Sequence, residues 1–428
     1  MSETIEPFVL DVDGTPDLTP SIKKRNRMTG YVTIFLTVFT LGTTEIFASW
    51  YSTQMGGTPL EAGLAFGIFG LVYMFSPAIG GRLSDRTGRK KTLILSTGGY
   101  IIVIILYLLP FISPWQLITI RAIEGFVFGF VAPTIEGMVS ELETRSEVAT
   151  LGNFSTSWSA SMILPPMVIA YLSGIYGDQS GIFVILGVEV LALIIIATFL
   201  QGYKRRDGKI ETGPKHDLPT FENIGLTGDT NGSVSKTSPI FIASYLSVML
   251  WGVVSTIVLG LFPSYIIILS NLGYPFGSED FGNLLLIWNL VRTMTFIVIA
   301  RISGEHIKQA IVLGSLLSVI SGFMLFLFID IWIFAIAMVI AGMAVGLNYL
   351  GALYLVVSAT NIEKGAHAGL VESMGGVGLF LGPIVGGWIM EIGLTLPYLM
   401  WAMLGIVVLI LIAFFIMRDS KIEQVTIL

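Results

Sequence analysis

Three ionisable side chains, Glu45, Arg121 and Glu124, lie inside long apolar stretches of the chain. A charge inside such a stretch costs about 3 kcal/mol on membrane-insertion scales, so it faces a partner or a wet cavity. Counting about 1.5 Å per helical residue places Glu45 and Arg121 at a similar depth, about 10 Å below one surface. We therefore expect the two side chains to meet, and a carboxylate in that setting is suited to carrying a proton.

Arg121 and Glu124 allow two interpretations. They are one helical turn apart and could form an ion pair with only a structural role. Alternatively, they take part with Glu45 in proton transfer. The roles of two further acids are less defined. Glu189 is expected to accept a hydrogen bond, for example from Tyr107, rather than to carry a proton. Glu372 suits a gate or a coupling role equally well.

Arg292 is predicted to reach the middle of its apolar stretch, next to Asn289. The planar fork of an arginine can bind a carboxylate or phosphate through two hydrogen bonds, which suits an anionic group on a substrate. The alternative is an internal ion pair with Glu124 or Glu372. The candidate substrate-binding residues are Trp251, Ser255, Asn289, Arg292, Asn348 and Tyr349, which together could form an amphipathic wall.

The elements that hold these side chains are apolar segments long enough to cross about 30 Å of hydrocarbon. Of the 428 residues, 54% are hydrophobic and 12% are charged, with a mean hydropathy of +0.83, which indicates an integral membrane protein. Twelve spans are predicted, at residues 30–52, 62–80, 92–111, 115–138, 149–174, 181–202, 239–269, 281–300, 309–329, 331–357, 366–390 and 396–417.

Lys and Arg residues give the orientation of these spans. Arg121 and Arg292 fall within spans, and the rest of the 23 lie in segments that alternation places on one side. By the positive-inside rule that side is the cytoplasm. We therefore expect a multi-pass protein of the cell membrane with both termini cytoplasmic and with the first span acting as its own uncleaved signal. The expected divisions are a tail at 1–27, a six-helix bundle at 28–202, a linker at 203–237, a second bundle at 238–418 and a tail at 419–428.

The two bundles look like copies of each other. A shift of 217 residues superposes Gly125 on Gly342, Gly129 on Gly346, Gly152 on Gly369 and Pro166 on Pro383. Such parallel repeats predict two bundles related by a pseudo-two-fold axis along the membrane normal, with a binding site between them near the midplane.

The segment 81–91, between the second and third spans, reads Gly-Arg-Leu-Ser-Asp-Arg-Thr-Gly-Arg-Lys-Lys. We expect it to be a cytoplasmic loop. Its pattern resembles the loop that marks the major facilitator superfamily of secondary transporters, with matches that include Gly81, Asp85, Arg86, Gly88 and Arg89. The resemblance implies an all-α fold of twelve helices and a gating role for this motif, in which Asp85 meets the start of the span 366–390.

Two other motifs extend the resemblance. The sequence from Leu117 to Gly129, which contains Arg121 and Glu124, is similar to a motif of proton-coupled members, in which that arginine is assigned to proton transfer. The resemblance also implies that the first, fourth, seventh and tenth spans line the cavity, which favours Glu45 over Glu189 for coupling. A glycine-proline pattern resembles the antiporter signature but lies in the span 366–390; we expect it to allow close packing or gating by Gly369, Gly378, Gly382, Pro383, Gly386 and Gly387.

Other functional classes have little support in the sequence. The chain has no cysteine and only three histidines, and neither a metal-ligand cluster nor a phosphate-binding glycine loop is visible. No cofactor, metal or enzymatic activity is therefore expected, and the net charge of −6 argues against a nucleic-acid partner. We expect a proton-coupled exporter of a drug-like amphiphilic solute. The alternatives are an organic-anion transporter and a non-transporting receptor or scaffold; the coupling ion, the direction and the choice between symport and antiport stay open.

Overall fold

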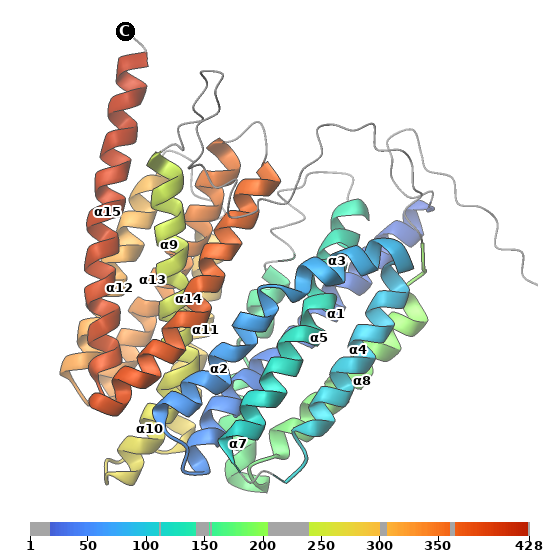
Figure 1. The fold of residues 1–428 in the computed structure, drawn as a ribbon, viewed down its shortest axis with the longest axis horizontal. Helices are drawn as coiled ribbons and strands as arrows, with labels where there is room; N and C mark the ends of the chain where they lie inside the picture. The colour runs from blue at the N-terminus through green and yellow to red at the C-terminus, as the bar shows by residue number, and fades with distance from the viewer. Residues whose placement is uncertain are drawn as a thin grey trace, which may run out of the picture.

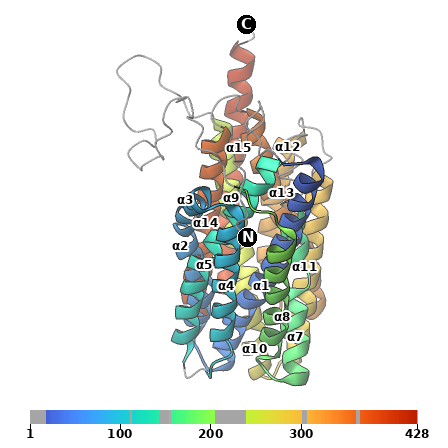
Figure 2. The ribbon, with the colours of Figure 1, turned by 90° about the vertical axis from the view of Figure 1, so that its right-hand side faces the viewer.

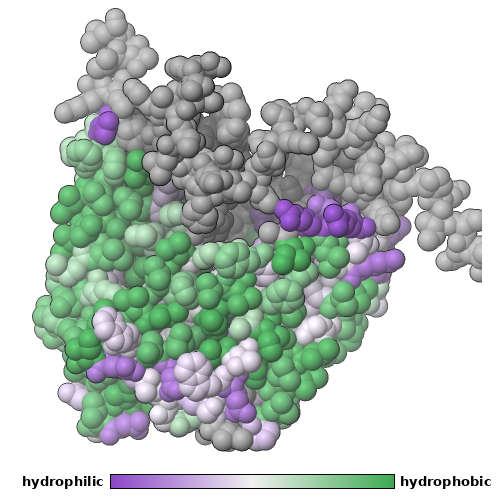
Figure 3. Space-filling model, in the orientation of Figure 1, coloured by the Kyte–Doolittle hydropathy of each residue, from purple (hydrophilic) through white to green (hydrophobic). Residues whose placement is uncertain are grey.

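The computed structural model is helical and describes residues 18–110, 113–142, 154, 156–203, 239–299, 306–359 and 364–426. Ten helices in these ranges are long and apolar enough to cross a membrane by length and composition. The remaining two predicted spans correspond to α2 (Pro59–Tyr73) continued by α3 (Ser76–Thr87), and to α4 (Arg89–Leu106). A hydrophobic band separates two more hydrophilic ends of the molecule (Figure 3).

The helices form two bundles that stand side by side (Figure 1). The N-terminal bundle contains α1 (Pro20–Gln54), α2, α3, α4, α5 (Pro114–Leu142), α7 (Pro165–Tyr176) and α8 (Ser180–Phe199). The C-terminal bundle contains α9 (Pro239–Thr256), the π-helix η2 (Ile257–Leu261), α10 (Phe262–Asn271), α11 (Ser278–Ile299), α12 (Ile307–Leu327), α13 (Ile331–Ala359), α14 (Lys364–Ile392) and α15 (Leu396–Thr426). The expected linker at 203–237 lies outside the described residues except for Tyr203.

Helix boundaries follow local sequence signals. Thr58 and Glu61 form a capping box at the start of α2: Glu61 donates its backbone N–H to the Thr58 hydroxyl at 3.2 Å, and Thr58 N–H donates to the Glu61 carboxylate at 2.9 Å. Gly88 separates α3 from α4 at a φ of +93°, a left-handed conformation that glycine adopts without strain. The expected loop at 81–91 is therefore wrong in form, because helix continues to Thr87 and resumes at Arg89.

Three of the predicted spans are interrupted. α2 and α3 are separated at Met74 and Phe75, and the turn at residues 162–164 precedes α7, which begins with Pro165 and Pro166. In the C-terminal bundle, α9 and α10 are joined by the wide turn of η2. Such breaks are tolerated in membrane helices where neighbouring helices satisfy the freed backbone groups.

Glycine positions show that the two bundles are packed alike. A Cβ on Gly125 of α5 would lie 2.6 Å from the carbonyl oxygen of Phe69 in α2, and one on Gly342 of α13 would lie 2.8 Å from that of Trp288 in α11. Both glycines thus allow the fourth span of a bundle to pack closely on the second. This equivalence agrees with the internal repeat found in the sequence.

The bundles meet through equivalent helix pairs. α2 packs on α14, α7 packs on α11, and α1 packs on η2 and α10. These contacts lie toward the end of the molecule opposite to the one that carries Arg25 and Arg86, which we call the basic end. The helices of the two bundles diverge toward the basic end (Figure 1), and Figure 2 shows α1, α4, α5 and α8 side by side within the N-terminal bundle.

Candidate functional site

A network of buried polar groups is centred on Glu124 of α5. Its carboxylate accepts hydrogen bonds from Tyr100 at 2.7 Å, from Tyr107 at 2.6 Å, from Thr44 at 2.5 Å and from Arg121 at 2.7 Å. The side chains of Glu124 and Arg121 are fully buried. The expected ion pair between these two residues is confirmed, and Glu124 has donors around both of its oxygens.

Arg121 connects this network to the neighbouring helices. Its Nε donates to the carbonyl oxygen of Ala65 in α2 at 3.2 Å, and its guanidinium carbon lies 4.5 Å from the centre of the Phe69 ring. The remaining nitrogen, Nη2, forms no hydrogen bond within the described residues but lies 3.6 Å from Glu45 Oε1. The expected meeting of Glu45 and Arg121 is therefore confirmed as an ion pair rather than as a hydrogen bond.

Glu45 interacts with two cations. Its side chain is 11% exposed, whereas that of Arg121 is fully buried, so Glu45 is the member of this pair that solvent can reach. Its carboxylate also interacts electrostatically with Arg292, which belongs to α11 of the opposite bundle. Glu45 thus joins the charges of the two bundles.

Arg292, Asn289 and Ser255 each carry a buried polar atom that forms no hydrogen bond within the described residues. The guanidinium carbon of Arg292 lies 4.7 Å from the centre of the Trp288 ring, and its Nε has no hydrogen-bond partner in the described part of the chain. The same is true of Asn289 Oδ1 and Ser255 Oγ, which are also buried. Arg292 is not bonded to Glu124, whose carboxylate is occupied by other donors, and the Glu372 side chain lies outside the described residues.

The other substrate-binding candidates divide into two groups. Trp251 and Tyr349 face each other with ring centres 4.6 Å apart, and Trp251 Nε1 has no partner among the described residues. Asn348 is engaged instead, because its side-chain oxygen accepts hydrogen bonds from Ser247 at 2.9 Å and Ser315 at 3.1 Å. Asn348 therefore ties α9, α12 and α13 together.

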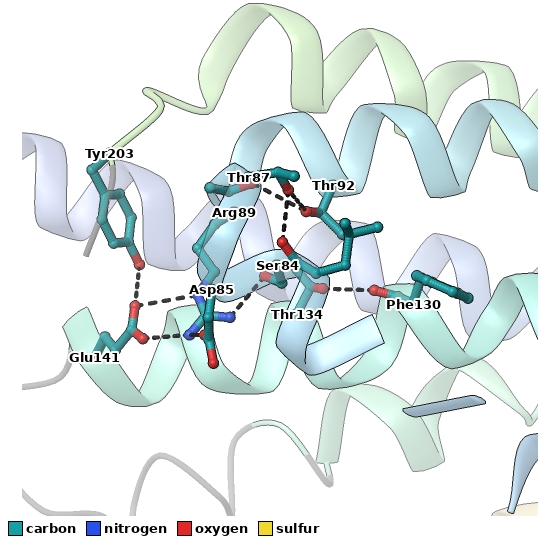
Figure 4. A network of polar contacts seen from close by, with 11 residues as sticks. Ser84, Asp85, Thr87, Arg89, Thr92, Phe130, Thr134, Glu141 and Tyr203 are labelled. Carbon is teal, nitrogen blue, oxygen red and sulfur yellow. Dashed lines mark hydrogen bonds and ion pairs between the residues drawn. The ribbon is translucent and has the colours of Figure 1, made fainter. Parts of the chain in front are cut away.

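The motif around residue 85 forms a second network at the basic end (Figure 4). Arg89 bonds Ser84 at 2.7 Å, Asp85 at 2.9 Å and Glu141 at 2.5 Å, and Tyr203 donates to Glu141 at 2.9 Å. These contacts join α3, α4, α5 and the segment after α8. Arg86 and Asp85 are exposed, Gly81 has open space around it, and the expected partner of Asp85 at the start of α14 lies outside the described side chains.

The electrostatics of this second network keep its charges fixed. Burial lowers the pKa of Arg89, but the hydrogen bond and charge of Glu141 outweigh burial and raise that pKa above its ordinary value. Burial and the Glu141 carboxylate raise the pKa of the Tyr203 hydroxyl well above its ordinary value. Arg89 therefore stays charged and Tyr203 stays a hydrogen-bond donor across the physiological pH range.

The glycines of α14 pack against helices of both bundles. A Cβ on Gly382 would lie 2.5 Å from Thr256 Oγ1 in α9, and one on Gly386 would lie 2.7 Å from Leu261 in η2. Gly378 also packs on α9, whereas Gly387 lies against Pro59 of the opposite bundle and Pro383 lies against Gly63 there. Nothing is described of the surroundings of Gly369. These contacts show close packing; a gating role stays a prediction.

Sequence reasoning missed several functional partners. Tyr100 and Tyr107 are seven residues apart on one helix face, a spacing that marks them as neighbours without naming their partner. The expected bond from Tyr107 to Glu189 is wrong, because Tyr107 donates to Glu124 while Glu189 accepts from Thr37 at 3.2 Å. The roles of Glu141 and Tyr203 carried no signal in the sequence.

Known proteins are similar to this chain in sequence and in fold. The family model described as the Major Facilitator Superfamily matches residues 30–328 and 281–426. The Multidrug resistance protein MdtG of Escherichia coli (strain K12 / DH10B) is 30% identical over 183 residues, which cover 41% of this chain and 44% of MdtG. The match thus spans less than half of that relative's length.

Solved structures of transporters share the fold at low sequence identity. The nucleoside transporter NupG superposes with a TM-score of 0.73 and 14% identity, covering 91% of this chain and 99% of NupG. A peptide transporter of the POT family in complex with sulfate gives 0.71 and 14%, covering 94% and 95%. The human organic anion transporter MFSD10 gives 0.62 and 15%, covering 91% and 99%.

Proposed function

Because the chain belongs to the major facilitator superfamily of membrane transporters, we propose that it moves a small organic solute by alternating access, driven by protons that bind at Glu45. The single observation that carries the proposal is that Glu45 forms an ion-pair contact with Arg121 of its own bundle, at 3.6 Å, and interacts electrostatically with Arg292 of the other. A group whose charge acts across the contact between two moving bodies can couple protonation to their movement.

The proposed coupling follows from the two states of the carboxylate. Ionised Glu45 attracts Arg292 and favours the arrangement in which the bundles are in contact near these residues. Protonated Glu45 loses that attraction, whereas Arg121 keeps its hydrogen bond to Glu124 at 2.7 Å and stays compensated. Protonation thus weakens an attraction between the bundles, while Arg121 keeps its counter-charge in Glu124.

The substrate that we propose is amphiphilic. The adjacent rings of Trp251 and Tyr349 offer an apolar surface, and the unpaired atoms of Ser255 and Asn289 offer hydrogen bonds. Few polar groups on a mainly apolar wall are typical of small-molecule sites. Similarity to part of a protein named for multidrug resistance supports export of drug-like solutes as the first candidate.

Transport in proteoliposomes with and without an imposed pH gradient tests this function. Glu45→Gln mimics the protonated side chain and should abolish gradient-driven accumulation while substrate binding, measured by calorimetry, survives. Glu61→Gln is the matched control, because Glu61 serves only in the capping box of α2 and glutamine can replace it there. Full gradient-driven accumulation by Glu45→Gln would show that the proton binds elsewhere.

The unpaired Nε of Arg292 favours a second candidate, an organic-anion transporter. A carboxylate or phosphate on the substrate would satisfy this nitrogen and compete with Glu45 for the guanidinium group.

The Arg292→Lys variant distinguishes the two candidates. It keeps the charge but loses the planar fork, so an anionic substrate should bind about tenfold or more weakly, whereas a cationic or neutral one should bind nearly unchanged. Arg82→Lys, at an exposed position, is the control. A set of anionic and cationic compounds measured by calorimetry decides, and unchanged binding of every anion contradicts the second candidate.

A further inference from the structure

Glu189 is a buried acid that the proposed coupling does not use. It lies in α8, within the N-terminal bundle, and is fully buried. Its Oε1 accepts a hydrogen bond from Thr37 of α1 at 3.2 Å, while Oε2 has no hydrogen-bond partner in the described part of the chain. One oxygen of this carboxyl group is therefore satisfied and the other is not.

The charges around Glu189 do not compensate an ionised carboxylate. From α1 it is faced by the hydroxyl groups of Thr37 and Thr40, and the charged side chain that acts on it, from α5, is Glu124. From α4, the Tyr100 hydroxyl, which donates to Glu124, also interacts with Glu189. An ionised Glu189 would thus be a second negative charge in the same apolar interior, and no cation of the described residues acts on it. Proteins avoid such a buried, uncompensated charge by keeping the carboxyl group neutral.

The position of Glu189 lies between the Glu45 site and the basic end. Thr37, its hydrogen-bond donor, precedes Thr44 by seven residues on the same helix, which is about 10 Å along the axis. Thr44 bonds Glu124, so Glu189 lies about two helical turns nearer to the basic end than that network.

Buried polar groups continue beyond Glu189 along the same helix. Thr33 is buried with its hydroxyl unpaired among the described residues, and Thr29 and Asn26 follow at spacings of four and three. Asn26 pairs with the backbone of Gln201 through two hydrogen bonds, of 2.9 and 3.0 Å, at the basic end. The residues Asn26, Thr29, Thr33, Thr37, Thr40 and Thr44 form a row that we call the α1 polar row.

We propose that Glu189 is a second proton-binding site, which holds its proton on Oε2 in this arrangement and releases it toward the basic end along the α1 polar row. The proposal rests on the proposed proton coupling. In each cycle one O–H bond of Glu189 breaks and the proton passes to water at the basic end; the carboxylate then takes up one proton that comes from water at the opposite end. Protons thus cross inside the N-terminal bundle, apart from the solute, which moves between the bundles.

Infrared spectroscopy of the purified protein in lipid tests the protonation directly, because a protonated carboxyl group has a C=O absorption distinct from that of a carboxylate. At neutral pH we expect this absorption in the wild type and in Glu45→Gln, and its loss in Glu189→Gln. An unchanged absorption in Glu189→Gln would mean that Glu189 is ionised and would overturn the proposal. Should Glu189→Gln not fold, Thr37→Val removes only the bond to Oε1 and should move the absorption to higher frequency; no change overturns the proposal equally.

The number of protons moved per solute tests the transport role. It is obtained from the imposed pH gradient at which net solute flux reverses in proteoliposomes. We expect Glu189→Gln to transport with one proton fewer per solute than the wild type, whereas Glu45→Gln stays uncoupled because it lacks the charge change that links protonation to the movement of the bundles. An unchanged number of protons per solute would show that Glu189 keeps its proton throughout the cycle, and would overturn its role in transport. If Glu189→Gln lost coupling while Glu45→Gln kept normal coupling, the proposal for Glu45 would fail and the proposal for Glu189 would stand. The two proposals can therefore fail separately.

Discussion

At the scale of single residues, Glu124 and Glu45 share one arginine but are held very differently. Glu124 is fully buried and accepts four hydrogen bonds, from Arg121, Thr44, Tyr100 and Tyr107. Glu45 has one ion-pair contact with Arg121, at 3.6 Å, and retains some exposure. Glu124 therefore anchors Arg121 through several contacts, whereas Glu45 is held by a single contact and is the carboxylate for which we propose a change of charge.

This difference predicts that replacing glutamate by glutamine affects stability at one position and not at the other. Glu124→Gln leaves the fully buried Arg121 without its nearest carboxylate, and breaking a buried ion pair costs about 3–5 kcal/mol. We expect a clearly lower melting temperature for Glu124→Gln in detergent. Glu45→Gln, the matched control, should melt close to the wild type, and equal losses in both variants would contradict the division of roles.

Counting residues along helices predicted the meeting of Glu45 and Arg121, because depth depends only on the rise per residue. The rotation of each helix about its axis is set by packing with several neighbours, and this is what decides the partners of Tyr100 and Tyr107. A one-turn pair such as Arg121 and Glu124 avoids the problem, since both residues lie on one helix face. The sequence alone could not predict the electrostatic interaction of Arg292 with Glu45, because it depends on how the two bundles dock.

At the scale of elements, the contact between α2 and α14 consists largely of backbone. Gly63 of α2 lies against the carbonyl group of Pro383, and a Cβ on Gly67 would lie 3.1 Å from the Pro383 ring. Small residues that let two backbones touch are a common basis for helix association in membranes. The interruption at Met74 and Phe75 ends α2 where this contact weakens, since a Cβ on Gly376 of α14 would have only the tip of the Met74 side chain within 4.0 Å.

A side chain on Gly63 should force these two helices apart. In Gly63→Leu we expect a shift toward conformations in which the end opposite the basic end is open, because the Pro383 carbonyl cannot retreat without moving α14. Reactivity of a cysteine introduced at Ser264, which bonds Thr53 across the bundles at 2.8 Å, measures this opening. Gly81→Leu is the control, since a Cβ there meets nothing within 4 Å; equal reactivity in both variants would count against the idea.

Helix existence was predictable from apolar length, whereas helix breaks were not. The π-helical turn Ile257–Leu261 occurs in an uninterrupted apolar run, and the break before Ser76 precedes Pro77 by two residues. The π-helical turn makes a contact with the opposite bundle: the Ser49 hydroxyl donates to the carbonyl group of Gly260, which lies in that wide turn. No pattern within residues 257–261 records this contact.

At the scale of the whole molecule, the repeat in the sequence corresponds to equivalent helix packing in space. The shift that aligns Gly125 with Gly342 also relates their partners, since α5 packs on α2 as α13 packs on α11. The same relation connects the two contacts between bundles, α2 with α14 and α7 with α11. An arrangement with this symmetry suits a cycle in which each end opens in turn.

The orientation in the membrane is testable because the chain has no cysteine of its own. A single cysteine at Asn271, the exposed last residue of α10 at the end opposite the basic end, should react with an impermeant thiol reagent added outside intact cells. A cysteine at Arg86, exposed at the basic end, should react only after the membrane is made permeable. The reverse pattern would place the basic end outside and would contradict the positive-inside assignment.

The glycine contact between the bundles also affects how well the protein prevents protons from leaking across the membrane. Where Gly63 and Gly67 lie against Pro383, and Gly387 against Pro59, backbone touches backbone and no long side chains must close over a gap. A chain of water molecules needs room for at least one probe-sized sphere at each step, about 10–15 Å³. This seam leaves little room of that kind, so an idle transporter should dissipate a pH gradient across the bilayer no faster than protein-free liposomes do.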